Sequence, residues 1–254
     1  MKKLLVIFLI ATSYCFAQSN TNSEKTWLID YYFKQDKELN EQLSSAFNLT
    51  IAGKYPDAKN IIYKSKGKYQ KNSLPYSALL SYQANIFYNE SKYDLAFKLA
   101  DSAVDILAQS DKTNRYVVKA LNIKAKALSA LNEFESSEGI LSETIQLAIS
   151  IDDKNGLAGS YYLQGSNASD RGFYSKSKDL LLKSIAIRTE IKDDMGLAAS
   201  YSFLGLTYSH LGDYMLGVEY IQKSITIRER IKDKRGLANS YLCLYKIYID
   251  IGEA

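Results

Sequence analysis

The sequence of 254 residues is poor in the residue types on which cross-linked and metal-binding domains depend. It contains two cysteines, two prolines, one tryptophan and one histidine. If the N-terminal segment that holds Cys15 is removed, Cys243 is the sole thiol and an intramolecular disulfide is excluded. His210 has no second histidine, no cysteine and no suitably spaced carboxylates beside it, so we expect no metal site. Stability must therefore come from packing.

An excess of one charge is also lacking. The 32 lysines and arginines nearly balance the 28 acidic residues, giving a net charge of +4, or +2 without Lys2 and Lys3, and both signs are interspersed. This balance argues against a nucleic-acid surface on this segment. We also find no nucleophile with a base, no paired catalytic carboxylates and no phosphate loop or cofactor fingerprint. We therefore expect a protein that is not an enzyme and needs no cofactor.

The N-terminus has the pattern of an export signal. Lys2 and Lys3 precede an apolar run over residues 4–11, and a small residue, Ala17, ends the segment. The run is too short for a membrane-spanning helix, which needs roughly 20 apolar residues. The pattern predicts a cleavable signal peptide over residues 1–17 and a periplasmic or extracellular location in a bacterium.

A lipoprotein anchor at Cys15 is the alternative interpretation of this segment. The residue before a lipidated cysteine is small in such sites, whereas here it is the bulky Tyr14. The sequence therefore favours cleavage over lipidation.

A repeat of forty residues occupies the C-terminal half. The tripeptide Gly-Leu-Ala begins at Gly156, Gly196 and Gly236, and Ser-Tyr follows each copy one residue later. An Ile-Arg pair recurs at the same spacing, ending in Arg188 and Arg228. Self-similarity at a fixed period of this length indicates a solenoid.

Each repeat reads as a helical hairpin. Apolar or small residues recur every three or four positions over 197–211 and again over 214–231, and Gly212-Asp213 supplies a turn between the two stretches. Residues 232–235 form a polar connector to the next unit. We expect no strand and predict an all-α chain.

An aromatic residue after each turn sets the register of the weaker repeats: Tyr55, Tyr93, Phe134, Tyr174 and Tyr214. After a linker or first helix over 18–35, the register predicts a solenoid over 36–254. Its hairpins are expected at 36–70, 74–112, 115–153, 156–193 and 196–233, with a half-repeat at 236–254.

Two glycines interrupt predicted helices. Gly165 and Gly205 lie mid-helix, where glycine costs about 1 kcal/mol relative to alanine. We expect a close crossing of the paired helix to compensate for that cost.

The unit resembles the tetratricopeptide repeat (TPR). Residues 201–208 read Tyr-Ser-Phe-Leu-Gly-Leu-Thr-Tyr, residues 212–214 read Gly-Asp-Tyr, and Gly217 holds the small position that follows. The match is weaker upstream, where Lys124-Ala125 and Gln83-Ala84 replace Leu-Gly. The forty-residue variety resembles repeats of kinesin light chains and of exported sensory regions of bacterial signalling proteins.

The resemblance implies antiparallel hairpins stacked into a right-handed superhelix, whose first helices line a concave groove for a peptide or protein partner. Carried across by register, the candidate groove residues are Asn85, Asn89, Lys119, Asn122, Lys126, Tyr162, Ser166, Asp170, Ser202, His210, Asn239 and Lys246.

Lys119, Asn122 and Lys126 form the most specific of these sets. Their spacing places them on one helix face, where two ammonium groups and an amide could hold a carboxylate or an acidic peptide. This resembles the carboxylate clamp of chaperone-binding TPR domains, although the full set of Lys, Asn and Arg over two repeats is not matched. A solvated polar face is the alternative.

The last residues, 251–254, align with the middle of a hairpin, and the helix over 237–251 is apolar on several sides. We therefore expect further chain beyond Ala254. Two functions remain open: an exported interaction scaffold, or the periplasmic sensory region of a larger signalling protein with a histidine-kinase or DNA-binding output domain. Contact with a membrane is expected only through such a further segment.

Overall fold

The computed structural model describes residues 36–110 and 115–252. The predicted signal peptide over 1–17, the alternative anchor at Cys15 and the segment 18–35 lie outside the described residues.

The described residues form eleven helices and no strand, which confirms the all-α prediction. The helices are α3 (Lys37–Ile51), α4 (Tyr55–Lys66), α5 (Leu74–Asn89), α6 (Tyr93–Ser110), α7 (Arg115–Ala130), α8 (Phe134–Ser150), α9 (Lys154–Asp170), α10 (Tyr174–Glu190), α11 (Asp194–His210), α12 (Tyr214–Arg230) and α13 (Lys234–Ile251).

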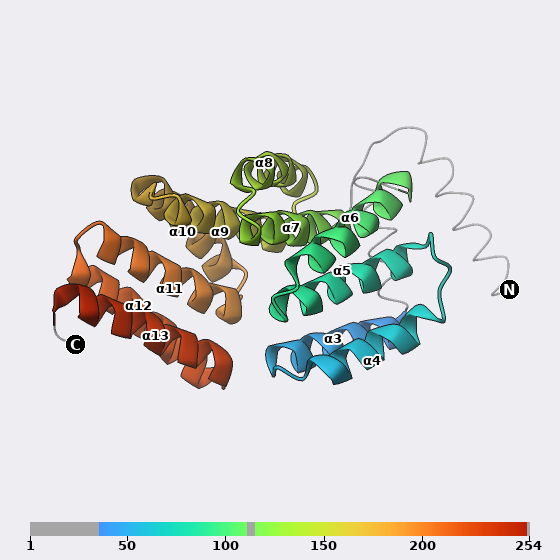
Figure 1. Cartoon of the computed structure of the whole chain (residues 1–254), viewed down its shortest axis with the longest axis horizontal. Coiled ribbons are helices and arrows are strands. Elements are labelled where there is room, and N and C mark those ends of the chain that lie inside the picture. Colours follow the sequence, from blue (N-terminus) through green and yellow to red (C-terminus); the bar gives the residue numbers. More distant parts are fainter. Residues whose placement is uncertain (1–35, 111–114, 253–254) are drawn as a thin grey trace, which may run out of the picture.

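The helices pair in sequence order into hairpins, and the hairpins stack into one curved array. The first helices of successive hairpins pack side by side, α5 on α7, α7 on α9, α9 on α11 and α11 on α13. Figure 1 shows the array curving from α3 and α4 past α7 and α8 to α12 and α13, so that its two ends face each other. The arrangement is the predicted α-solenoid.

Aspartates fix the starts of the last three first helices. The Oδ1 atoms of Asp153, Asp193 and Asp233 accept the backbone N–H of the glycine three residues later, at 3.1, 3.0 and 2.9 Å. This is an N-cap, which satisfies an amide that has no partner within the helix. The helices therefore begin two residues before the Gly-Leu-Ala tripeptide at which the sequence placed them.

The mid-helix glycines lie at close helix crossings, as expected. A Cβ on Gly205 would lie 2.7 Å from the carbonyl oxygen of Gly217 in α12, and a Cβ on Gly165 would lie 2.9 Å from Cγ of Leu181 in α10. Any side chain at these positions would push the two helices of the hairpin apart.

An arginine near the end of each of the last two hairpins joins it to the next helix. The Arg228 guanidinium donates from Nη1 to Oδ2 of Asp233 at 2.7 Å and from Nε to the Ser224 hydroxyl at 3.1 Å. Arg188 makes the same bonds to Asp193 and Ser184. Both arginines are buried. The recurring Ile-Arg pair therefore supplies a buried ion pair between repeats.

The same ion pairs explain the glycine of the Gly-Leu-Ala tripeptide. A Cβ on Gly196 or Gly236 would collide with the guanidinium of Arg188 or Arg228 and with the capping carboxylate. Glycine is required here for close approach.

The first prediction concerns the crossing glycines. Gly205→Ala should destabilise the fold by about 1–3 kcal/mol, because the methyl group meets backbone that cannot move without separating α11 from α12. Gly139→Ala is the matched control, because Gly139 is exposed on α8 with open space around it. It should stabilise by up to about 1 kcal/mol through helix propensity. Urea unfolding measures both, and equal effects would contradict the assigned crossing.

The second prediction concerns the buried ion pair. Arg228→Ala should cost about 3–5 kcal/mol, because it leaves the carboxylate of Asp233 buried without its charged partner. Arg230→Ala, two residues along the same helix, removes an exposed pair with Asp194 and should cost less than about 1 kcal/mol. Thermal unfolding of the two variants compares them, and a similar loss in both would refute the structural role of Arg228.

Candidate functional site

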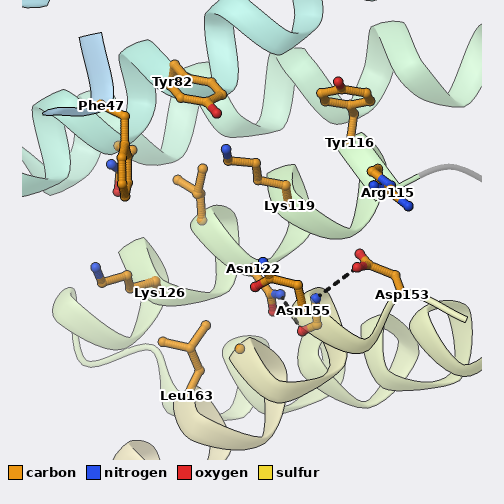
Figure 2. A pocket seen from close by; sticks show the side chains of 14 residues that line it. Phe47, Tyr82, Arg115, Tyr116, Lys119, Asn122, Lys126, Asp153, Asn155 and Leu163 are labelled. Atoms are coloured by element: carbon orange, nitrogen blue, oxygen red, sulfur yellow. Dashed lines mark hydrogen bonds between the residues drawn. The ribbon is translucent and has the colours of Figure 1, made fainter. Parts of the chain in front are cut away.

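The first helices of three successive hairpins enclose a cavity of about 420 Å³. It is shown in Figure 2 and is lined by Phe47, Tyr82, Asn85, Arg115, Tyr116, Lys119, Asn122, Ile123, Lys126, Asp153, Asn155, Gly156, Gly159 and Leu163. Apart from Phe47 on α3, these residues belong to α5, α7, α9 or the N-cap of α9. A pocket therefore lies on the face where the sequence placed the groove.

Helix α7 supplies most of the polar lining. Arg115, Lys119, Asn122 and Lys126 follow one another at intervals of three or four residues, so they share one helix face. The neighbouring face of α7, with Val118 and other apolar residues, is buried against the adjoining helices. The amphipathic pattern of α7 thus turns a row of cations toward the cavity.

Lys119 rests on an aromatic ring. Its Nζ lies 3.6 Å from the centroid of Tyr82, which projects from α5 across the cavity (Figure 2). A cation–π contact orients the ammonium group and leaves its hydrogen-bond donors available to a ligand.

Lys126 lies deeper and is half-buried. Its Nζ is 3.9 Å from the centroid of the Tyr88 ring at the end of α5. Burial, together with the positive charge of Arg235, lowers the pKa of Lys126 to about 8. Burial also raises the pKa of Tyr88 to about 12, so its hydroxyl stays protonated at neutral pH. The ammonium of Lys126 therefore lacks a full complement of water and lies near a second cation.

Asn122 is engaged within the protein. Its Nδ2 donates to the carbonyl oxygen of Gly156 at 3.1 Å, and its Oδ1 accepts the Ser160 hydroxyl at 2.8 Å. These bonds join α7 to α9. The amide lines the cavity as predicted, but its hydrogen bonds serve the packing of two repeats, so the ligand role predicted for it is not supported by this geometry.

Asn85 and Asn89 occupy successive turns of α5. Asn85 lines the cavity. Asn89 lies outside the lining, donates from Nδ2 to the Asn85 carbonyl at 2.7 Å and accepts a bond from Arg235 Nη1 at 3.3 Å.

The candidates on α9 lie beyond the cavity lining. Tyr162 packs edge-on against Phe203, with ring centroids 5.3 Å apart, and its burial raises the pKa of its hydroxyl well above the usual range. Ser166 is half-buried. Asp170 ends the helix, and partial loss of hydration raises the pKa of its carboxyl group.

Ser202 is a correction to the predicted groove, and His210 lies outside the cavity lining. Ser202 is buried, and its hydroxyl bonds those of Ser224 at 2.8 Å and Ser240 at 3.1 Å, because a small residue here lets three helices meet. His210 is exposed at the turn end of α11 and stacks on Tyr174, with ring centroids 4.6 Å apart. On α13, Asn239 and Lys246 are exposed and do not line the cavity.

Sequence reasoning missed several cavity residues. Arg115 and Tyr82 were identifiable, because each lies one helical turn before a predicted groove residue, Lys119 and Asn85. Asp153 and Asn155 belong to the start of α9, which the sequence placed only at Gly156. Arg235, which lies outside the lining, had no signal in the sequence, because its partner Asn89 is 146 positions away.

Metal and membrane features are absent from the part of the chain that the structure describes. Over residues 36–110 and 115–252, no group of three His, Cys, Asp or Glu side chains is placed to hold a metal ion. In the same ranges no helix combines the length and apolar character needed to span a bilayer.

No family model and no curated protein matches the sequence, whereas solved structures do match the fold. A Rap protein complexed with competence and sporulation factor superposes with a TM-score of 0.71 at 18% identity, covering 91% of this chain and 65% of its own. BtubC from P. vanneervenii gives 0.59 at 19% identity, covering 83% and 88%. A kinesin light chain with TPR-like repeats from Podosopora anserina gives 0.52 at 14% identity, covering 76% and 96%.

These similarities concern the arrangement of the helices, because the sequence identities are low. They agree with the forty-residue repeat, the turn aromatics and the glycine crossings described above. The chain therefore has the fold of the tetratricopeptide-repeat proteins.

Proposed function

We propose that this solenoid is an interaction scaffold that binds a peptide or protein partner on its concave side, at the cavity between α5, α7 and α9. The observation that carries the proposal is that two lysines of the lining contact aromatic rings and form no ion pair within the part of the chain that the structure describes. Lys119 and Lys126 rest on the rings of Tyr82 and Tyr88, without a carboxylate partner among the described residues.

Comparison with other cations of the array supports this assignment. Arg188 pairs with Asp193, Arg228 with Asp233 and Lys124 with Asp101. Each of these three cations, which lie between packed helices, therefore has an aspartate partner within the protein. An acidic group of a partner would complement the two cavity lysines, while the rings of Tyr82 and Tyr88 would contact its apolar parts.

A binding role suits the cavity better than catalysis. Its lining offers cations, amides and aromatic rings, but no nucleophile held beside a base. The one acid in the lining, Asp153, caps α9 through Oδ1. The Rap structure, which contains competence and sporulation factor, offers a precedent for ligand binding by this fold, although the identity of 18% transfers no residue role.

Export is part of the proposal and is supported by the pattern of residues 1–17. A second candidate, the sensory region of a larger signalling protein, is favoured by an exposed apolar face on α13. There Tyr241, Leu242 and Tyr245 have exposed fractions of 49%, 59% and 58%, which favours contact with another polypeptide.

A third prediction separates these candidates. An immunoblot of cell fractions, with an antibody against residues 36–252, should detect the protein in the soluble exported fraction. Recovery of the protein in the membrane fraction would support the sensory region instead, and protein confined to the cytoplasm would contradict export.

A fourth prediction tests the cavity. The double variant Lys119→Ala, Lys126→Ala should weaken capture of the native partner at least tenfold, because a hydrogen bond to a charged group contributes about 1.5–3 kcal/mol. Helicity and thermal unfolding should stay nearly unchanged.

The matched control is Lys64→Ala with Lys98→Ala. It removes the same charge from exposed lysines on α4 and α6, which are second helices outside the cavity lining. Capture should match that of the wild-type protein. Equal recovery with both double variants, measured by quantitative pull-down from the exported fraction, would remove the cavity from the proposal.

A further inference from the structure

Residues from two distant hairpins of the array meet. Arg235, in the first turn of α13, donates from Nη1 to Oδ1 of Asn89, the last residue of α5, at 3.3 Å. The two residues are 146 positions apart, and their helices otherwise pack in different places, α5 on α3, α4, α6 and α7, and α13 on α11 and α12. Figure 1 shows the C-terminal hairpins facing α3, α4 and α5 across the curve of the array.

Lys126 belongs to the same meeting point. Its ammonium rests on the ring of Tyr88, the neighbour of Asn89, and the positive charge of Arg235 contributes to the lowered pKa of Lys126. A cation from the middle of the solenoid and one from its last helix are therefore close enough for their charges to repel.

Neither cation has an acidic partner among the described residues. Lys126 contacts an aromatic ring and Arg235 contacts an amide oxygen. The acidic group that faces this area from α9 is Asp170, whose charge helps to raise the pKa of Tyr88, but it forms no ion pair with either cation. The buried arginines of the array, by contrast, each bind an aspartate.

We propose that Lys126 and Arg235, with Asn89 orienting the guanidinium, form a carboxylate-binding site shared by α7, in the middle of the array, and α13, its last helix. The inference rests on the proposed function, and it specifies one acidic group of the partner and where that group binds. Arg235 keeps further N–H donors beyond the one that Asn89 uses, so its planar guanidinium can bind the carboxylate with two parallel hydrogen bonds. Lys126 supplies the second charge.

The site depends on the curvature of the whole array. In a solenoid each repeat contacts its neighbours, so the separation of the ends is the sum of small rotations between repeats. Lys126 and Arg235 come together when these rotations match the curvature seen here. A bound carboxylate links α7 to α13 and therefore favours this curvature over more open ones.

The probe for the test is a fluorescein-labelled peptide of eight alternating alanine and glutamate residues with an amidated C-terminus. Two comparison peptides carry glutamine in place of glutamate, one amidated and one with a free C-terminal carboxylate. Fluorescence anisotropy should show the glutamate peptide or the free-carboxylate peptide binding at least tenfold more tightly than the amidated glutamine peptide. Whichever of these two peptides binds more tightly shows whether the site prefers a side-chain or a terminal carboxylate.

Arg235→Ala should abolish this discrimination. Lys234→Ala is the matched control, because it removes an exposed positive charge from the adjacent residue of the same helix turn and should leave the discrimination intact. Circular dichroism checks that both variants stay folded. The inference is overturned if Arg235→Ala binds as Lys234→Ala does, or if the wild-type protein does not distinguish the peptides.

A second readout locates the bound carboxylate. Reductive methylation with ¹³C-formaldehyde allows the pKa of Lys126 to be followed by NMR, and a Lys126→Arg variant assigns the signal. A saturating acidic peptide should raise this pKa from its value near 8, because a carboxylate favours the protonated amine. An unchanged pKa with bound peptide would place the peptide elsewhere.

Capture of the native partner by the variants distinguishes failure of the cavity proposal from failure of the shared carboxylate site. If the native partner is lost with Lys119→Ala, Lys126→Ala but captured normally by Arg235→Ala, the cavity remains the binding site and the shared site is refuted. If capture is normal with all these variants, both proposals fall.

Discussion

The buried ion pair between an arginine and an aspartate is the interaction on which the regular part of this array depends. One carboxylate does two tasks: Oδ1 of Asp233 caps α13, and Oδ2 binds Arg228. The pair thereby fixes both the start of a helix and its distance from the preceding hairpin. Around it, Gly236 leaves room for the guanidinium and Ser224 accepts its Nε–H. A large part of the conserved spacing between successive repeats of this chain follows from that one geometry.

The cavity lies where the arginine of this interaction is replaced. The position of Arg188 and Arg228 is taken one repeat earlier by Ala148, and the side chain of Val118 fills the space beside Gly156. Asn122 joins the two repeats there by neutral hydrogen bonds to α9. The pocket between α5, α7 and α9 thus coincides with a change in how the repeats are linked.

The sequence allowed the fold to be predicted because each repeat is a local unit. Period, turn aromatics and mid-helix glycines such as Gly205 depend on neighbours within one hairpin, and the resemblance to TPR proteins, carried across by register, predicted that α7 lines the groove. Ser202 was misplaced because register identifies a position but not how closely its helices approach. The Asn89–Arg235 contact lay beyond prediction, since it results from rotations accumulated over four hairpins.

The uneven chemistry of the junctions has a mechanical consequence. At the two later junctions a buried arginine binds the aspartate that caps the next helix, whereas beside the pocket Ala148 replaces that arginine and the Asn122 amide bonds α9. A change in curvature would therefore disturb different contacts at the two places: a guanidinium and a carboxylate at the later junctions, and an amide beside the pocket. A bend between α7 and α9 would also change the shape of the binding site, because residues of both helices line it.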